Sequence, residues 1–452
     1  MPIRRVLFLL LTLLMALSAH AQPQPSPRQL AWQQLETTAF LHFTVNTFTD
    51  KEWGDGTESP AVFNPAKLDA RQWIRTLRDA GFKLAIITAK HHDGFCLWPS
   101  KLTEHSVKNS PWKAGKGDLV RDVADACREF GLKFGVYLSP WDRHEPRYGT
   151  AAYNDYYKAQ LRELLTNYGP VTEVWFDGAK GENAKDMSYD FAGYWTLVRQ
   201  LQPQAVMFSD VGPDVRWVGN EAGNAGETCW STINTKGMAP GVADPKYLNR
   251  GEPLGKFWIP AETDVSIRPG WFYHPAEDAN VRSAQNLVDL YYQSVGRNSL
   301  LLLNVPPNRE GLLSEPDVVS LLAFRRILNE TFRTNVVTDS PKLTDEKLST
   351  FVTLSANQPL SIELNGEQTF DRILIQENIA DGQRIVGGRV EYWNGTDWRL
   401  IQTFTTVGYK RLLRFPAVRS NRIRLTITDI NNPALISEAG VYKASAGESV
   451  NK

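Results

Sequence analysis

From residue 38 to about residue 332, short apolar runs rich in β-branched and aromatic side chains alternate with longer amphipathic stretches. The runs predict strands at residues 39–43, 84–88, 133–138, 171–176, 205–209, 256–261 and 299–305. The stretches between them predict helices at residues 69–80, 118–130, 152–165, 191–201 and 281–295. Gly81, Gly131 and Gly169 follow three of these helices, where a left-handed glycine commonly ends a helix.

This alternation predicts a parallel α/β fold. A stretch of about 300 residues fits an imperfect (β/α)8 barrel better than a doubly wound sheet. No GxGxxG motif follows the first strand, which also argues against a dinucleotide-binding fold. Only seven strands can be identified, so we expect the eighth to be missing or short.

Near residue 335 the pattern changes to short alternating runs, at residues 370–376, 388–393, 398–404 and 422–427. They follow a last long helix predicted at residues 315–331. Asn394-Gly395 between two of these runs is a hairpin signal. We therefore expect a catalytic barrel domain at residues 22–333, a linker at residues 334–344 and an all-β sandwich at residues 345–446.

The first 21 residues have the pattern of a secretory signal peptide. Arg4 and Arg5 precede an apolar run at residues 6–17, and Ala19-His20-Ala21 offers a cleavage site before Gln22. The run is too short to span a bilayer, and no later stretch reaches about 18 apolar residues. The sequence thus predicts an exported protein, periplasmic or secreted, without membrane insertion after cleavage. It makes no prediction of oligomeric state.

The amino-acid composition argues against some classes of function and favours others. Lys and Arg together number 50, as do Asp and Glu, so the surplus of positive charge that a nucleic-acid-binding protein needs is missing. The 14 Trp and 15 Tyr are a heavy load of flat amphipathic rings, which sugar-binding clefts use. Cys96, Cys127 and Cys229 show no metal-binding spacing and are expected to be small buried side chains.

In an α/β barrel, reactive groups lie at the carboxyl ends of the strands and in the loops that follow. The fourth strand ends in Trp175-Phe-Asp177-Gly178, and strand alternation places Trp175 and Asp177 on one side. The alternative is a structural aspartate that opens an Asp-Gly turn.

Three of the seven histidines also fall at strand ends, namely His42, His91 and His92. Adjacent side chains on an extended segment point in opposite directions, so His91 and His92 cannot easily bind one metal ion. They are read as hydroxyl-binding groups, as a structural pair or as a fragment of a metal site. Tyr137 lies near the end of the third strand, and Glu52-Trp53 follows the first strand.

Residues 210–255 lack clear periodicity, and a loop of this length in a compact domain is usually functional. It contains Arg216, Glu221 and Glu227, and the predicted sixth strand leads to Glu262 and Trp271. Aromatic neighbours could exclude water from Glu221 or Glu227 and raise the carboxyl pKa. The alternative for Glu227 is a solvated loop glutamate.

A carboxylate on a strand end and another on a loop suit glycoside hydrolysis, which needs a proton donor and a group that attacks the sugar. From the residues alone we infer an exported sugar hydrolase without a catalytic metal or cofactor. The alternatives are a glycan-binding protein that has lost its chemistry and a hydrolase of another α-linked sugar.

The motifs in this order resemble those of family 29 glycoside hydrolases, the retaining α-L-fucosidases. The likeness runs through His42, Glu52-Trp53, the HHDG run at 91–94, the WFDG run at 175–178 and the RNSLLLLN run at 297–304. The resemblance implies that Asp177 is the nucleophile. It also implies that fucose is held by His42, Glu52, Trp53, His91, His92, Tyr137 and Trp175.

The GPDVRWVGNEAG run is similar to the branch of that family that acts on α-1,3- and α-1,4-linked fucose. This implies that Glu221 is the acid/base, with Glu227 and Glu262 as rivals, and that Arg216 and Trp271 line the pocket. Lewis-type and other fucosylated oligosaccharides would be the substrates. The C-terminal domain resembles a discoidin-like (F5/8 type C) sandwich, which would bind glycans or brace the barrel and for which the resemblance implies a candidate structural calcium.

Overall fold

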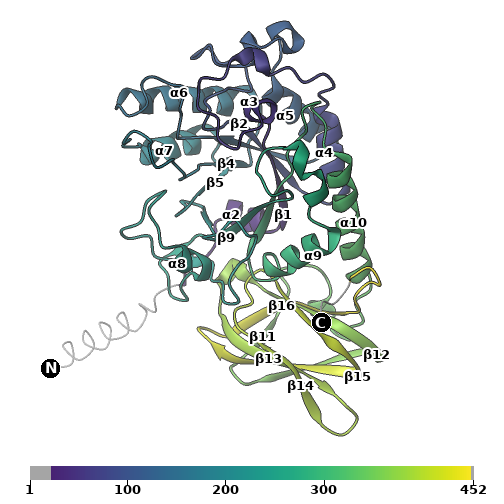
Figure 1. The fold of residues 1–452 in the computed structure, drawn as a ribbon. Helices are drawn as coiled ribbons and strands as arrows, with labels where there is room; N and C mark the ends of the chain where they lie inside the picture. Colours follow the sequence, from purple (N-terminus) through teal and green to yellow (C-terminus); the bar gives the residue numbers. More distant parts are fainter. Residues whose placement is uncertain (1–21, 449–452) are drawn as a thin grey trace, which may run out of the picture.

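The computed structural model describes residues 22–448, which form a parallel barrel and an antiparallel sheet domain (Figure 1). The predicted signal peptide therefore lies outside the described residues. The barrel closes in the order β1-β10-β9-β6-β5-β4-β3-β2. Its strands are β1 (Thr37–Leu41), β2 (Leu84–Lys90), β3 (Lys133–Leu138), β4 (Glu173–Trp175), β5 (Val206–Ser209), β6 (Val215–Trp217), β9 (Ala261–Ser266) and β10 (Leu300–Asn304).

The predicted barrel is confirmed, and its eighth strand is β6. This strand has three residues and carries Arg216 at its centre, so it gives no apolar run in the sequence. The strand predicted at residues 256–261 is wrong. Those residues lead into β9, which begins at Ala261, and Phe257–Trp258 is a short strand, β8, paired with β7 (Thr232–Ile233) away from the barrel.

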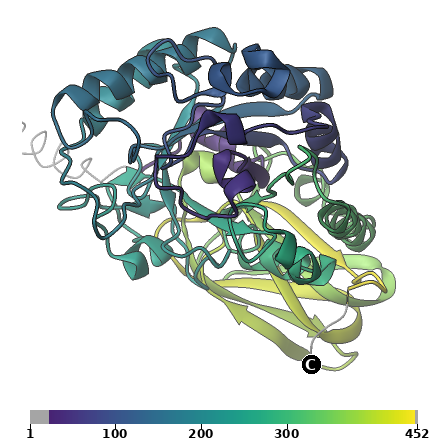
Figure 2. The same cartoon turned by 45° about the horizontal axis from the view of Figure 1, so that its top comes forward.

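The longer helices form the outer wall of the barrel (Figure 2). The helices of the described chain are α2 (Pro27–Gln33), α3 (Val45–Thr49), α4 (Ala70–Asp79), α5 (Leu119–Phe130), α6 (Ala152–Asn167), α7 (Phe191–Leu201), α8 (Pro245–Arg250), α9 (Ala284–Gln293) and α10 (Glu315–Thr331). The predicted helices are confirmed, although α9 starts later than expected because Ser283 caps its first turn. In the described chain no helix separates β5 from β6, which is why the barrel is imperfect.

The barrel interior is packed with large side chains rather than open. Phe40, Tyr137, Trp175 and Phe208 lie inside it, and the Trp175 and Phe208 rings stack with centroids 4.3 Å apart. Trp32 of α2 closes the interior from below, where its indole N–H donates to Glu173 Oε2 at 2.8 Å. The floor of any site at the strand ends is therefore rigid and aromatic.

The C-terminal domain is a six-stranded antiparallel sheet in the order β11-β16-β12-β15-β13-β14. Its strands are β11 (Val352–Leu354), β12 (Pro359–Glu377), β13 (Ile385–Trp393), β14 (Trp398–Phe404), β15 (Arg411–Ile430) and β16 (Ala434–Tyr442). Register shifts break the long pairing of β12 with β15, and apolar side chains from all six strands meet in one core. The predicted hairpin joins β13 to β14 with Gly395 in a left-handed conformation (φ 103°).

The predicted linker at residues 334–344 lies along this sheet, since Val336 N–H donates to Val441 and Thr338 N–H donates to Glu363. All three cysteines are buried and free, as expected. Within residues 22–448, no helix combines the length and the apolar character needed to cross a membrane.

Candidate active site

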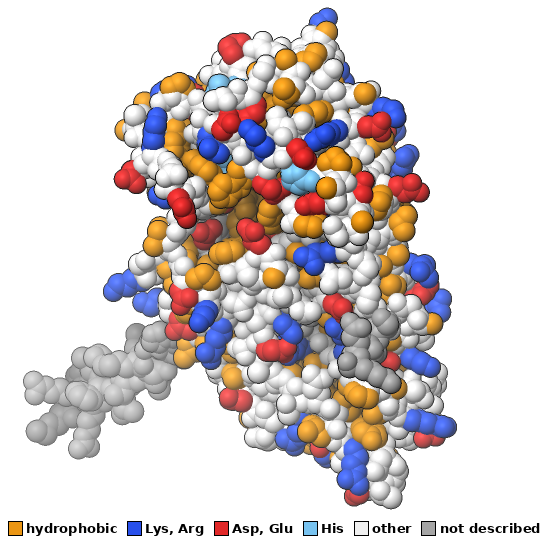
Figure 3. Space-filling view, viewed as in Figure 1, with side chains coloured by type: hydrophobic (Ala, Val, Ile, Leu, Met, Phe, Trp, Pro, Cys, Tyr) orange, Lys and Arg blue, Asp and Glu red, His pale blue; other side chains and the backbone are white. Residues whose placement is uncertain are grey.

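A cavity of about 180 Å³ opens at the carboxyl ends of the barrel strands, and we call it the strand-end pocket. The molecular surface is visibly hollowed in the barrel half, with hydrophobic walls and acidic side chains near the rim (Figure 3). The lining residues are Phe40, His42, Trp53, His91, His92, Tyr137, Trp175, Asp177, Ala179, Glu221, Asp264 and Trp271. The structure thus brings together all the predicted site residues except Glu52 and Arg216.

Asp177 is held in place by two hydrogen bonds. The hydroxyl of Tyr137 donates to its Oδ2 at 2.7 Å, and the backbone N–H of Ala179 donates to its Oδ1 at 2.8 Å. His92 Nε2 lies 3.7 Å from the same Oδ2. Trp175 lines the pocket on the same side as Asp177, as strand alternation predicts. The carboxylate is therefore fixed in orientation above an aromatic floor.

His91 and His92 both face the strand-end pocket, with ring centroids 4.0 Å apart. The expectation that they point in opposite directions is wrong. The strand ends at Lys90, and the chain then turns, with Gly94 N–H donating to the carbonyl of His91. Strand alternation does not apply beyond that point.

The pocket histidines are neutral near pH 7. Burial lowers the pKa of His42 to about 3 and that of His92 to about 4, and it lowers the pKa of His91 well below its usual value. His42 Nδ1 is paired with Asn304 Oδ1 at 2.8 Å, and His92 Nδ1 with Ser139 Oγ at 2.7 Å. Neutral rings held this way leave their other nitrogens to exchange hydrogen bonds with a ligand hydroxyl.

Glu221 projects from a turn after β6. Burial raises its carboxyl pKa, and the negative charges of Asp177 and Glu52 add to this, while a hydrogen bond from Trp271 opposes it. The turn packs closely on the barrel at Gly223, which has a φ of 74° and where a Cβ would lie 2.7 Å from Leu290. Glu221 is thus an exposed carboxyl of this site whose environment favours the protonated form.

Glu52 does not line the pocket. Its carboxylate accepts hydrogen bonds from the backbone N–H groups of Trp271 at 2.8 Å and Phe272 at 3.0 Å, and it pairs with His274 Nε2 at 2.7 Å. Its carboxylate is thus occupied by protein partners outside the pocket lining. Glu52 instead fixes the segment that carries Trp271.

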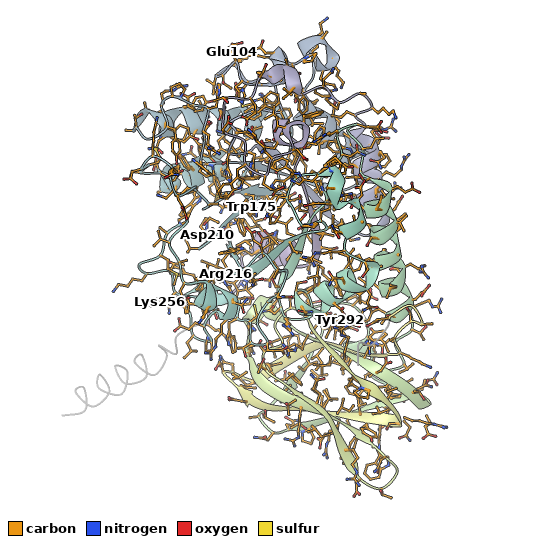
Figure 4. The ribbon with its side chains drawn as sticks, in the orientation of Figure 1. Glu104, Trp175, Asp210, Arg216, Lys256 and Tyr292 are labelled. Carbon is orange, nitrogen blue, oxygen red and sulfur yellow. The ribbon has the colours of Figure 1, made fainter. Side chains whose placement is uncertain are left out.

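Arg216 does not line the pocket either. Its side chain points away from the barrel mouth, because alternation along β6 places Trp217 on the inner side. The guanidinium is fully buried and donates to the carbonyl oxygens of Leu248, Trp230 and Ile259. In Figure 4, Arg216 lies apart from Trp175, towards α8.

The two rivals of Glu221 have other partners. The Glu227 carboxylate is ion-paired with Arg297 and Arg411. Glu262 is buried beneath the pocket, where it accepts from the Trp175 indole N–H at 3.0 Å and hydrogen-bonds with the Glu173 carboxyl. Neither glutamate lines the pocket.

Asp264 is a pocket residue that the sequence did not reveal. It accepts from the Trp217 indole N–H at 2.9 Å, and burial raises its carboxyl pKa well above the usual value. It lies on β9 two residues after Glu262, in the segment between Glu262 and Trp271 that follows the predicted sixth strand.

A larger cleft of about 600 Å³ adjoins the strand-end pocket and shares Asp177, Glu221 and Asp264 with it. Trp217, Tyr189, Val242 and Asp210 line its outer part. Within residues 22–448, no group of three or more His, Cys, Asp or Glu side chains is placed to hold a metal ion. The strand-end pocket itself presents carboxyl groups set among neutral hydrogen-bonding rings.

Comparison with known proteins identifies this arrangement. The family model for alpha-L-fucosidase matches residues 21–330, which include every pocket residue. The chain belongs to the α-L-fucosidase family. It is accordingly a glycoside hydrolase whose substrates carry fucose.

Relatives of this fucosidase include Alpha-L-fucosidase 1 of Arabidopsis thaliana, which is 46% identical over 444 residues, or 93% of this chain and 87% of the relative. A solved glycoside hydrolase 29 family member from a rumen bacterium is 43% identical with a TM-score of 0.87, covering 94% of this chain and 78% of that one. A Ruminococcus gnavus GH29 fucosidase in complex with fucose is 33% identical with a TM-score of 0.88, covering 96% and 98%. The similarity thus extends over the C-terminal domain as well as the barrel.

Proposed function

We propose that this α-L-fucosidase is exported and removes terminal α-1,3- or α-1,4-linked L-fucose from Lewis-type glycans with retention of configuration. The observation that carries the proposal is that Asp177 and Glu221 line one pocket in contrasting environments. Asp177 is held by two hydrogen-bond donors, whereas burial raises the pKa of Glu221. One carboxylate that attacks and one acid that donates are the pair that retaining hydrolysis needs.

In the first step, Asp177 attacks the anomeric carbon of fucose, and the bond from that carbon to the leaving oxygen breaks. Glu221 donates its proton to that oxygen, and a covalent fucosyl-enzyme forms. Tyr137 and the Ala179 N–H keep the attacking carboxylate oriented. For this step we expect the two carboxyl groups to lie about 5–5.5 Å apart.

In the second step, Glu221 is ionised and removes a proton from water. The water oxygen attacks the anomeric carbon and displaces Asp177, which releases fucose with its configuration retained. With the proton taken from water, Glu221 is again in its acid form, so the enzyme is ready for another cycle.

The strand-end pocket also contains groups suited to binding the sugar. His42, His91 and His92 are neutral and offer ring nitrogens to the fucose hydroxyls. Trp175, stacked on Phe208, presents a flat apolar surface to a ring face. A deoxy sugar with an apolar methyl group suits a pocket with these walls.

The proposed linkage preference rests on two observations. The GPDVRWVGNEAG run is similar to the branch that acts on α-1,3 and α-1,4 linkages, and the adjoining cleft beyond Glu221 has room for a branched leaving group. Export rests on the signal-peptide pattern of residues 1–21.

The test measures free fucose released from a Lewis-type trisaccharide, from 2′-fucosyllactose and from 4-nitrophenyl α-L-fucoside. We expect release from the branched trisaccharide at a much higher kcat/KM than from 2′-fucosyllactose. Equal rates on all three substrates would overturn the linkage preference and leave the fucosidase. Tight binding of the trisaccharide without release from any substrate would make a glycan-binding protein the better description.

A further inference from the structure

The acid loop, which we define as residues 218–231, connects Glu221 with the C-terminal domain. Glu227 of this loop places its carboxylate between two arginines from different parts of the chain. Arg297 precedes β10 of the barrel, and Arg411 begins β15 of the C-terminal domain, with its Nη2 2.9 Å from Glu227 Oε2. The residue that rivalled Glu221 for the acid role is thus an anchor of the same loop.

The backbone of the acid loop is bound to the same domain. The carbonyl of Glu227 accepts from Arg411 Nη1 at 2.7 Å and from Thr405 Oγ1 at 2.5 Å. The Cys229 N–H donates to Thr406 Oγ1 at 3.0 Å, and the Ser231 N–H donates to Gln383 Oε1 at 2.8 Å. Side chains of the C-terminal domain therefore satisfy backbone groups that the loop cannot satisfy by itself.

The anchoring side of the C-terminal domain is itself fixed to the barrel. The Leu412 N–H donates to Gly296 at 3.1 Å, and the Asn298 N–H donates to Lys410 at 3.1 Å. Gly408 has a φ of 61°, and a Cβ there would lie 2.2 Å from the Asn298 side chain, so only glycine fits this contact. The domain thus offers the acid loop a rigid support.

Glu221 lies in an exposed turn of the acid loop, and Trp271 donates to its carboxylate at 3.2 Å. Its turn is closed by the Asn220 side chain, which donates to the Asn224 carbonyl at 2.9 Å. The Asn224 carbonyl also accepts from Asn249 Nδ2 at 3.1 Å, and the Ala225 carbonyl accepts from Arg297 Nη1 at 2.9 Å. Arg297 therefore braces both Ala225 and Glu227, and the position of Glu221 depends on that junction.

We propose that the C-terminal domain is a positioning element of the active site, with Arg411 and Thr406 as positioning residues that hold the acid loop so that Glu221 reaches the leaving oxygen. This rests on the proposed role of Glu221. Proton donation requires hydrogen-bond reach, and a shift of about 1 Å from a distant substitution can cost roughly 100-fold in rate. The domain thus acts in catalysis without touching the sugar.

The experiment compares two arginines of the same strand. Arg411→Ala removes the anchor of the acid loop. Arg414→Ala removes a different bond between the barrel and the C-terminal domain, from Arg414 to Asp289 Oδ1 at 2.5 Å. The Arg414 guanidinium also lies over the Tyr292 ring. Figure 4 shows Tyr292 at this junction. Arg414 has no bond to the acid loop among the described residues, so the second variant controls for weakened domain docking.

The readout is the dependence of kcat/KM, which reports the first step alone, on the leaving group. It is measured with 4-nitrophenyl fucoside and with a fucoside of an unactivated alcohol. An activated leaving group needs no proton, so a displaced Glu221 affects mainly the unactivated substrate. We expect Arg411→Ala to lose roughly 10–100-fold on the unactivated substrate and far less on the activated one. Thr406→Val should give a smaller loss of the same kind, Arg411→Lys a partial recovery, and Arg414→Ala wild-type selectivity.

Equal losses on both substrates in Arg411→Ala, or the same selectivity change in Arg414→Ala, would overturn the positioning role. Thermal unfolding of each variant shows that the compared proteins are folded, and Thr406→Val provides the test without removing a charge. Glu221→Gln separates the two proposals. If it shows no leaving-group dependence, the proposed acid role fails; if it does and Arg411→Ala does not, only the positioning role fails.

Discussion

The indole N–H of Trp271 donates to Oε2 of Glu221 at 3.2 Å, so an aromatic wall of the strand-end pocket is bonded directly to the proposed acid. Donation to a carboxylate favours its charged form and therefore lowers the pKa. Burial acts in the opposite direction and is the larger effect. The Glu52 carboxylate, which fixes the Trp271 backbone, thereby also fixes the donor that tunes Glu221.

Replacing Trp271 by Phe should move the alkaline limb of the pH profile. The first step needs protonated Glu221, and loss of the hydrogen bond raises its pKa, so activity should persist to higher pH. The measurement is kcat/KM against pH with 4-methoxyphenyl α-L-fucoside, a substrate that needs the proton. Trp53→Phe, which changes another ring of the pocket, should leave the limb in place. A shift to lower pH in Trp271→Phe would contradict the contact.

Substitutions of Asp177 and of Glu221 should reduce activity in different ways. Asp177→Ala should abolish turnover while the protein stays folded, because no covalent intermediate can form. Glu221→Gln should reduce kcat/KM by roughly 10²–10⁴ on substrates that need a proton, and by less on activated ones. Steady-state kinetics and circular dichroism of both variants check this. Near-normal turnover of Asp177→Ala would remove Asp177 from the mechanism.

Arg216 should matter for stability rather than for substrate binding. Arg216→Met leaves three buried carbonyl oxygens without their donor, so we expect the free energy of unfolding to fall by about 2 kcal/mol or more. Urea unfolding measures this, with the exposed Arg250→Met of nearby α8 as the matched control. The KM of the folded variant should equal that of the wild type. A raised KM with unchanged stability would restore the pocket role expected from the sequence.

The Glu173–Glu262 pair should make stability depend on pH. Burial raises the pKa of Glu173 to about 7, and burial together with the Glu173 charge raises that of Glu262 well above the usual value. The unfolded chain releases both protons near pH 4.3, whereas the native pair retains them to higher pH. The contribution of the pair is therefore fully present below about pH 4 and is lost as pH rises through 7.

Glu262→Gln removes one of the two titrations and keeps a group that can hydrogen-bond. The free energy of unfolding should fall less steeply between pH 5 and pH 8 in this variant than in the wild type. The exposed substitution Glu367→Gln is the control and should leave the wild-type slope. Parallel slopes in Glu262→Gln and the wild type would show that Glu262 does not retain its proton over this range.

The sequence predicts those parts of the fold whose signal is local. Long apolar runs such as β2 and β10, and the capped amphipathic helices, were identified because burial imposes a period on each segment. Strand β6 has three residues with a buried arginine at its centre, and only its neighbours in the barrel make it a strand. The short strand therefore could not be seen, and β9 was misplaced as a result.

The site residues likewise fall into those that a local sequence pattern predicts and those that it does not. Strand alternation places Trp175 and Asp177 on one side, because Trp175 ends β4 and Asp177 follows two residues later. The partners of Glu227 and Arg216 come from segments distant in the sequence, so nothing nearby in the chain distinguishes an anchor from a pocket residue. His91 and His92 were misread because the chain turns at the point where the strand rule ends.

The missing helix between β5 and β6 has a consequence for how this enzyme can change. Only residues 210–214 join the two strands, and the wall of the cleft beyond them is built from Asp210, from Trp217 at the end of β6 and from the loop that carries Val242. The Val242 loop contributes no strand to the barrel and makes none of the hydrogen bonds that hold Asp177. Insertions and substitutions there can change which leaving glycans the cleft accepts without altering the residues around Asp177. Related enzymes can therefore differ in leaving-group specificity on this side of the barrel.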